Sequence, residues 1–167
     1  MGIPSTSKYI LKMKIKLFCL IALLFSLNGY SQVRLAKIFG DHMVLQRSQP
    51  VPVWGWAAPK EKIAVTINQQ IKTTHAEKTG RWTVDLDPQP AGGPYDLKVA
   101  GKDSLVLHDI LLGEVWICSG QSNMEFELSQ AMHAAEEIRD ANYPQIRQIK
   151  IPHTVSMTPK EDIPSGQ

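Results

Sequence analysis

Ser122 lies in a run of small and polar residues that follows directly on an apolar stretch, residues 115–118. A continuous apolar run of this kind predicts a buried strand of a parallel sheet, and such sheets bind ligands beyond the carboxyl ends of their strands. Gly120 permits a tight turn, and Gln121 and Asn123 can donate hydrogen bonds. Ser122 is therefore a candidate nucleophile, provided that a neighbouring base takes its proton.

Residues 120–124, Gly-Gln-Ser-Asn-Met, resemble the first sequence block of the SGNH-type esterases, in the form seen in sialate O-acetylesterases. The resemblance implies that Ser122 is the catalytic nucleophile and that its backbone N–H is one oxyanion donor. The block differs from the nucleophile elbow of α/β-hydrolases, which places glycine two residues after the serine, where this chain has Met124. The candidate supporting residues are Gly120, Gln121, Asn123 and Glu125.

Three flanking stretches extend the resemblance. Residues 38–47 resemble the start of the family's β-domain, residues 109–114 its junction with the esterase domain, and residues 154–163 a later loop. The resemblance implies a secreted serine esterase that removes O-acetyl groups from sialic acid or related glycans. It also implies a catalytic histidine and aspartate, and further oxyanion donors, from later blocks that this sequence does not contain. We therefore expect an N-terminal fragment that is inactive alone.

Two readings from other classes stay open beside the esterase. One is a non-catalytic β-sandwich module that binds a glycan or a protein partner, with Ser122 an incidental turn residue. The other is a truncated reading frame without a stable product, for which an exposed apolar surface over residues 115–118 would be the mark.

Other residues with reactive side chains fit structural roles better. Cys118 lies in the predicted strand, where a cysteine is usually a small buried hydrophobe. His133 is a lone histidine in a predicted helix, His153 is in the wrong context to replace the missing base, and nothing ties Asp41 or His42 to Ser122. The histidines are scattered, so the sequence predicts no metal site, and we expect no cofactor.

The net charge and the N-terminal sequence indicate the class of partner and the location of the protein. A formal net charge of +2 over 167 residues gives no indication of a nucleic-acid partner. Residues 1–31 have a signal-peptide layout, with lysines at positions 12, 14 and 16 before the apolar run 17–27. That run is shorter than the roughly 20 residues that a membrane-spanning helix needs. We expect a secreted or periplasmic protein without a membrane anchor after signal removal, acting on an O-acetylated sugar or glycan.

The elements that must position Ser122 fall into two domains. Residues 32–112 show period-two alternation with regular turn signals, which predicts an antiparallel β-sandwich. Trp82 is in phase with its core face, whereas Trp54 and Trp56 are left undecided. Residues 113–167 predict the opening strand–helix–strand unit of an SGNH-type, flavodoxin-like parallel α/β domain, incomplete here. Its helix follows Ser129 as N-cap, and its second strand lies in residues 145–151.

Overall fold

The computed structural model describes residues 32–163, which belong to one compact unit. The predicted signal peptide, residues 1–31, lies outside the described residues. Within the described part of the chain, no helix is long and apolar enough to cross a membrane.

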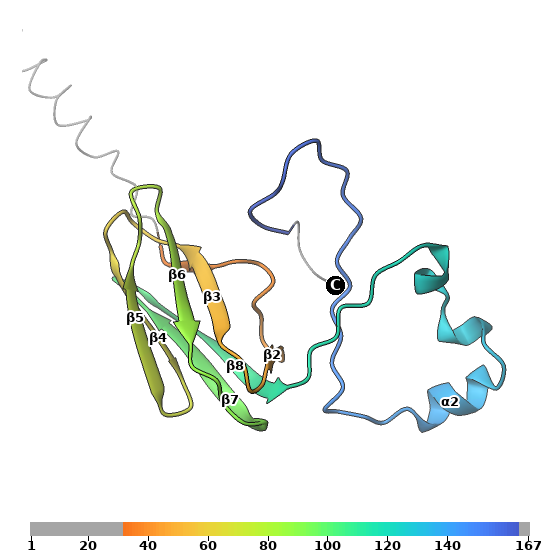
Figure 1. Cartoon of the computed structure of the whole chain (residues 1–167). Helices are drawn as coiled ribbons and strands as arrows, with labels where there is room; N and C mark the ends of the chain where they lie inside the picture. The colour runs from red at the N-terminus through yellow and green to blue at the C-terminus, as the bar shows by residue number, and fades with distance from the viewer. Residues whose placement is uncertain (1–31, 164–167) are drawn as a thin grey trace, which may run out of the picture. The chain divides into compact units, whose positions relative to one another are not determined.

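Two β-sheets form the body of the described chain (Figure 1). The three-stranded sheet has the order β1-β3-β6, and its strands are antiparallel. The five-stranded sheet has the order β2-β8-β7-β4-β5, and it is antiparallel except for the parallel pair β2 and β8. The predicted antiparallel sandwich is thus confirmed in outline and corrected at this one edge. The strands are β1 (Arg34–Leu35), β2 (Val44–Gln46), β3 (Val51–Trp56), β4 (Lys62–Ile67), β5 (Gln70–His75), β6 (Arg81–Leu86), β7 (Gly92–Ala100) and β8 (Ser104–Gly113).

The core contains side chains from both sheets. Alternate residues of β4 and β6 point inward, as the sequence period predicts, and Trp82 is only 1% exposed. Each fully buried aliphatic side chain contributes roughly 1.5–3 kcal/mol. Among the described residues, every buried hydrophobic side chain lies between Val33 and Leu112. The β-strands, with a few residues of the connections beside them, therefore supply the core of the described chain.

Trp54 and Trp56 point to the other face of β3 and are half-buried. The Trp54 ring meets Phe39 edge-on, with ring centroids 4.8 Å apart, and the Arg34 guanidinium lies 3.8 Å from the Trp56 ring centroid. Between them, Gly55 is required because a Cβ atom there would collide with the Arg34 carbonyl oxygen. These two tryptophans are thus covered by the segment around β1 rather than by the main core.

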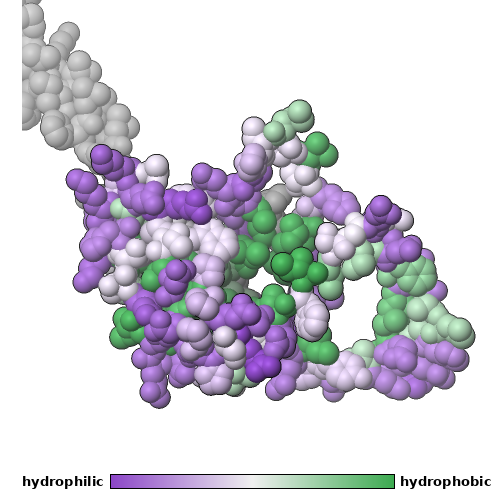
Figure 2. Space-filling view, in the orientation of Figure 1, coloured by the Kyte–Doolittle hydropathy of each residue, from purple (hydrophilic) through white to green (hydrophobic). Residues whose placement is uncertain are grey.

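The segment after β8 departs from the prediction. Neither residues 115–118 nor residues 145–151 form a strand, and within residues 114–163 there is no strand at all. Trp116 and Ile117 are 83% and 93% exposed, so the predicted buried strand is wrong here. A strand needs a neighbour to pair its N–H and C=O groups, and no strand lies beside this segment among the described residues. Figure 2 shows apolar atoms on the surface of this segment.

One helix follows, as predicted, but it begins later. After two 3₁₀ helices, η1 (Ser122–Glu125) and η2 (Leu128–Gln130), helix α2 covers Ala134–Asp140. Its N-cap is His133, in the left-handed region at φ 62°, so the prediction of Ser129 as N-cap is wrong. The Ser129 hydroxyl donates instead to Glu127 Oε2 at 3.1 Å. No residue of α2 is buried.

Candidate functional site

Ser122 is the first residue of η1, at the predicted tight turn. The Met124 N–H donates to the Gln121 carbonyl at 2.9 Å, and the Phe126 N–H donates to the Asn123 carbonyl at 3.3 Å. A Cβ atom at Gly120 would lie 2.7 Å from Met124 Cγ, which explains a glycine there by close approach. The turn exposes Ser122 to solvent, as a nucleophile requires.

Ser122 lacks a base in this structure. Within residues 32–163, no side chain forms a hydrogen bond with its hydroxyl, although the predicted supporting residues Gly120, Gln121, Asn123 and Glu125 are its near neighbours along the chain. A serine hydroxyl is a weak nucleophile unless an adjacent base accepts its proton. The described residues thus provide no group that would activate this candidate nucleophile.

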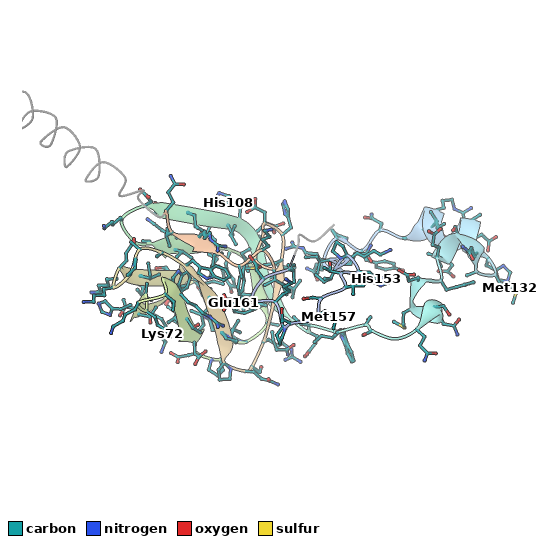
Figure 3. The ribbon with its side chains drawn as sticks, turned by 90° about the horizontal axis from the view of Figure 1, so that it is seen from above. Lys72, His108, Met132, His153, Met157 and Glu161 are labelled. Atoms are coloured by element: carbon teal, nitrogen blue, oxygen red, sulfur yellow. The ribbon has the colours of Figure 1, made fainter. Side chains whose placement is uncertain are left out.

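Glu125 faces the chain that follows α2. Its Oε1 lies 3.6 Å from His153 Nε2 and 3.9 Å from Lys150 Nζ. Figure 3 shows His153 on this later segment, whereas His108 lies on the sheet. All three side chains of the Glu125 group are largely exposed, so their ion pairs are weak. His153 therefore pairs with Glu125 and not with Ser122.

The other sequence candidates occupy separate places. Cys118 is exposed rather than buried, because the strand predicted around it is absent. His133 Nδ1 lies 3.8 Å from Glu136 Oε2 on α2, which fits the predicted structural role. Among the described residues, no three His, Cys, Asp or Glu side chains gather where they could hold a metal ion.

A polar cluster around Asp109 is the feature that sequence reasoning missed. Asp109 Oδ2 lies 2.6 Å from His42 Nδ1, and both carboxylate oxygens accept from Arg147 Nη2, at 2.9 and 3.0 Å. Arg147 Nη1 also donates to the Asp109 carbonyl. The hydrogen bonds from His42 and then Arg147 lower the pKa of the Asp109 carboxyl below its ordinary value. The sequence signals here were the resemblances of residues 38–47, which contain His42, and of residues 109–114 to parts of the family.

Asp41 and His42 hold their loop on β8. Asp41 Oδ1 accepts from the His108 backbone N–H at 2.7 Å, and the His42 N–H donates to the His108 carbonyl at 3.0 Å. His108 Nδ1 in turn lies 2.9 Å from Asp96 Oδ1. These contacts satisfy the polar groups within the loop and the sheet, which supports a structural role.

A second set of contacts holds the exit from β8. Glu114 accepts from Arg47 Nε at 2.6 Å and from Gln46 Nε2 at 3.1 Å, and the Val115 N–H donates to Gln46 Oε1 at 2.9 Å. The hydrogen bonds from Gln46 and Arg47 lower the pKa of the Glu114 carboxyl. The chain therefore leaves the sheet in a fixed direction, seven residues before Ser122.

Comparison with known proteins gives the chain a set of relatives. No family model matches it. It is 35% identical over 127 residues to a sialate O-acetylesterase from Mus musculus, covering 68% of this chain and 24% of that protein. It is 32% identical over 131 residues to a sialate O-acetylesterase from Homo sapiens, covering 71% of this chain and 25% of that protein. The chain thus spans about a quarter of the length of the curated relatives that it matches.

A solved structure agrees with these relatives. A crystal structure of a carbohydrate acetylesterase from Xanthomonas citri matches with a TM-score of 0.78 and 41% sequence identity. The match covers 81% of this chain and 32% of that one.

Proposed function

From its place as a sialate O-acetylesterase-like protein, we propose that this chain carries the nucleophile of a secreted serine esterase that removes O-acetyl groups from sialic acid or related glycans. The observation that carries the proposal is Ser122, exposed at a tight turn within Gly-Gln-Ser-Asn-Met. The homologues and the structural neighbour, all named as acetylesterases, support the same reaction class.

The proposed reaction proceeds through an acyl-enzyme. Ser122 Oγ attacks the acetyl carbonyl while its proton passes to a base, and the sugar hydroxyl leaves after taking up a proton. Water then hydrolyses the acetyl-serine ester and releases acetate. The Ser122 backbone N–H is one oxyanion donor, and each such donor is worth roughly 3–4 kcal/mol in hydrolases. The base and the other donors are expected from the later blocks that the family resemblance implies.

The domain assignment belongs to the same proposal. We assign residues 1–31 to an upstream extension and signal peptide, residues 32–112 to a β-sandwich module and residues 113–167 to the start of an SGNH-type parallel α/β domain. The exposed apolar side chains of residues 115–151 support the last assignment, because a parallel sheet needs helices on both faces to cover such residues.

The serine assignment is tested in the secreted protein purified from its source. Ser122→Ala should lower acetate release from O-acetylated sialic acid and from acetylated plant glycan by about 10⁴-fold or more, as nucleophile removal does in serine hydrolases. Ser129→Ala is the matched control, because Ser129 is an exposed serine on the same segment that bonds only to Glu127. Equal activity of the two variants would exclude Ser122 as the nucleophile.

The 167-residue chain by itself should be inactive. No base lies within hydrogen-bond reach of Ser122 among the described residues, so the hydroxyl stays protonated and weakly nucleophilic. Hydrolysis of a small acetyl ester by this chain should not exceed that of its Ser122→Ala variant. Turnover that the substitution abolishes would show that the chain contains a base after all.

A binding function is the second candidate, and one observation favours it. Trp54 and Ile38 line an open, solvent-facing cavity together with Ile151, Pro152 and polar residues such as Thr154 and Glu161. Aromatic and polar side chains at one cavity are typical of ligand sites. Retention of the chain on an immobilised glycan, lost in Trp54→Ala but not in Ser122→Ala, would support glycan binding without catalysis.

A further inference from the structure

Asp109 and Arg147 form a contact that joins two distant parts of the chain. They lie 38 residues apart in sequence, and Ser122 lies between them. The Arg147 side chain is only 19% exposed, which is low for an arginine. Its guanidinium reaches both the carboxylate and the backbone carbonyl of Asp109. Charge-assisted contacts of this multiple kind are among the strongest hydrogen bonds in proteins.

The backbone of Asp109 is shaped for this contact. Its φ of 58° lies in the left-handed region, which aspartate and asparagine adopt more readily than other residues with a side chain. His42 approaches the same carboxylate from the loop before β2. Asp109 thus ties three separate segments together: the strand β8, the loop before β2, and the chain after α2.

The opposite end of the Ser122 segment is held as well. Gln46 and Arg47, at the end of β2, bond to Glu114 and to the Val115 N–H. Since β2 pairs with β8, both ends of residues 115–147 are fastened to the same edge of the five-stranded sheet. The segment with Ser122 is therefore a loop closed at its base by two polar contacts.

We propose that Asp109 and Arg147 are positioning residues, which close the Ser122 loop onto the β-sandwich module of residues 32–112 (the β-module), so that this module determines the position of Ser122. The term positioning rests on the proposed nucleophilic role of Ser122, whereas the closure itself does not. The β-module is then a platform for the nucleophile segment. Neither Asp109 nor Arg147 belongs to the buried core, so loss of the contact should free the loop and leave the module folded.

The test follows the motion of the loop base directly. A fluorescent label is placed on Gln148→Cys, an exposed position beside Arg147, in a Cys19→Ser, Cys118→Ser background. Asp109→Asn keeps the left-handed backbone but removes the charge. In this variant we expect the fluorescence anisotropy of the label to fall toward its value in denaturant. Arg147→Gln removes the other partner of the ion pair and should lower the anisotropy by the same amount. Arg147→Lys keeps the charge without the planar fork and should lie between.

The matched control is Asp140→Asn, which removes an aspartate–arginine pair confined to α2 and its end. It should leave the label as immobile as in the parent. The near-UV circular dichroism of the module, to which buried Trp82 contributes, should be the same in all variants that support the proposal. A label equally mobile in the parent, Asp109→Asn and Arg147→Gln would overturn it, and so would equal loosening in Asp140→Asn. If Asp109→Asn does not fold, Arg147→Gln decides, since Arg147 lies outside the module.

These outcomes are distinct from those that test the proposed function. Anisotropy reports closure of the loop whether or not Ser122 reacts. If the label loosens as expected while Ser122→Ala retains esterase activity in the secreted protein, the closure is real and the nucleophile assignment is wrong. If the label does not respond while Ser122→Ala is inactive, the nucleophile stands and Asp109 does not position it.

Discussion

Trp82 places a large ring and a polar N–H in the centre of the β-module. It is 1% exposed, and among the described residues its Nε1 is the one buried side-chain nitrogen or oxygen without a hydrogen-bond partner. A buried donor without a partner costs roughly 1–3 kcal/mol. Removing the N–H should therefore offset part of the cost of removing ring atoms.

We accordingly predict that Trp82→Ala lowers the free energy of unfolding by about 3–5 kcal/mol, whereas Trp82→Phe costs clearly less. Phenylalanine keeps an aromatic ring in the core and has no polar atom to leave unpaired. Urea unfolding of the two variants, followed by far-UV circular dichroism, measures the difference. Equal losses would mean that the indole N–H is satisfied in solution, for example by a buried water.

Asp109 gives the loop closure a defined pH dependence. Its pKa is lowered from the ordinary 3.8 by the contacts with His42 and Arg147. A carboxyl with a lowered folded-state pKa stabilises the contact above its ordinary value, and the contribution disappears as the pH falls through the lowered pKa. The label at position 148 should thus stay immobile down to about pH 4 and become mobile only in stronger acid.

The pH profile has a built-in control. Asp109→Asn cannot titrate at this position, so its label should be mobile both above and below pH 4. Other acidic side chains also connect the segment after α2 to the β-strands, among them Asp162, whose Oδ1 accepts from the Lys37 N–H at 2.9 Å. A transition of equal size in Asp109→Asn would assign the effect to those groups instead.

At the scale of elements, the strands and α2 differ in what supports them. β4 buries alternate residues against both neighbouring strands and the opposite sheet, and Ile63 on it is 0% exposed. Helix α2 buries no residue, and Ile138 on its apolar face is 52% exposed. A helix of seven residues is too short to be stable by itself in water.

Replacing an isoleucine by alanine should therefore lower the free energy of unfolding much more in β4 than in α2. Ile63→Ala should cost about 2–5 kcal/mol, because it leaves a cavity in the core. Ile138→Ala should change the free energy of unfolding by no more than about 0.5 kcal/mol. Thermal unfolding of both variants tests this directly. A large loss in Ile138→Ala would show that something covers α2 in solution.

The strands could be predicted from sequence where their partners lie in this chain. The alternation in β4, β6 and β7 determines which face of each strand is buried, because a shift of one residue would expose the core face. The parallel edge β2–β8 was missed because three residues, Val44–Gln46, are too few to reveal a period. The apolar run 115–118 predicts a strand, but among the described residues no strand lies beside it to pair with its backbone.

The candidate site was predictable only in its local part. The exposed turn at Ser122 follows from Gly120 and the small polar residues around it. The contacts of Asp109 with His42 and Arg147 join residues 67 and 38 positions apart. Neither spacing leaves a repeating pattern in the sequence, so the pairs become visible only when β2 pairs with β8 and the chain after α2 returns to β8.

At the scale of the whole molecule, the described chain divides by burial. All the buried hydrophobic side chains of the described residues lie before residue 113, whereas most of the exposed large apolar side chains lie after it, among them Trp116, Ile117, Met132, Val155 and Met157. Contiguous exposed apolar surface on a soluble protein marks a site for association or a ligand. The two regions should therefore respond differently to a dye that binds such surface.

We predict that the chain from residue 32 to 167 enhances the fluorescence of anilinonaphthalene sulfonate strongly, and that a chain ending at Val115 does so weakly. Both should unfold cooperatively with similar thermal midpoints, because the shorter chain keeps the whole described core. Trp116→Ser with Ile117→Ser in the longer chain should lower the dye signal without moving the midpoint. A shorter chain that fails to fold would show that the segment after β8 supports the module as much as the module supports it. The β-module and the segment after β8 would then support each other, so the position of Ser122 and the stability of the β-module would be coupled.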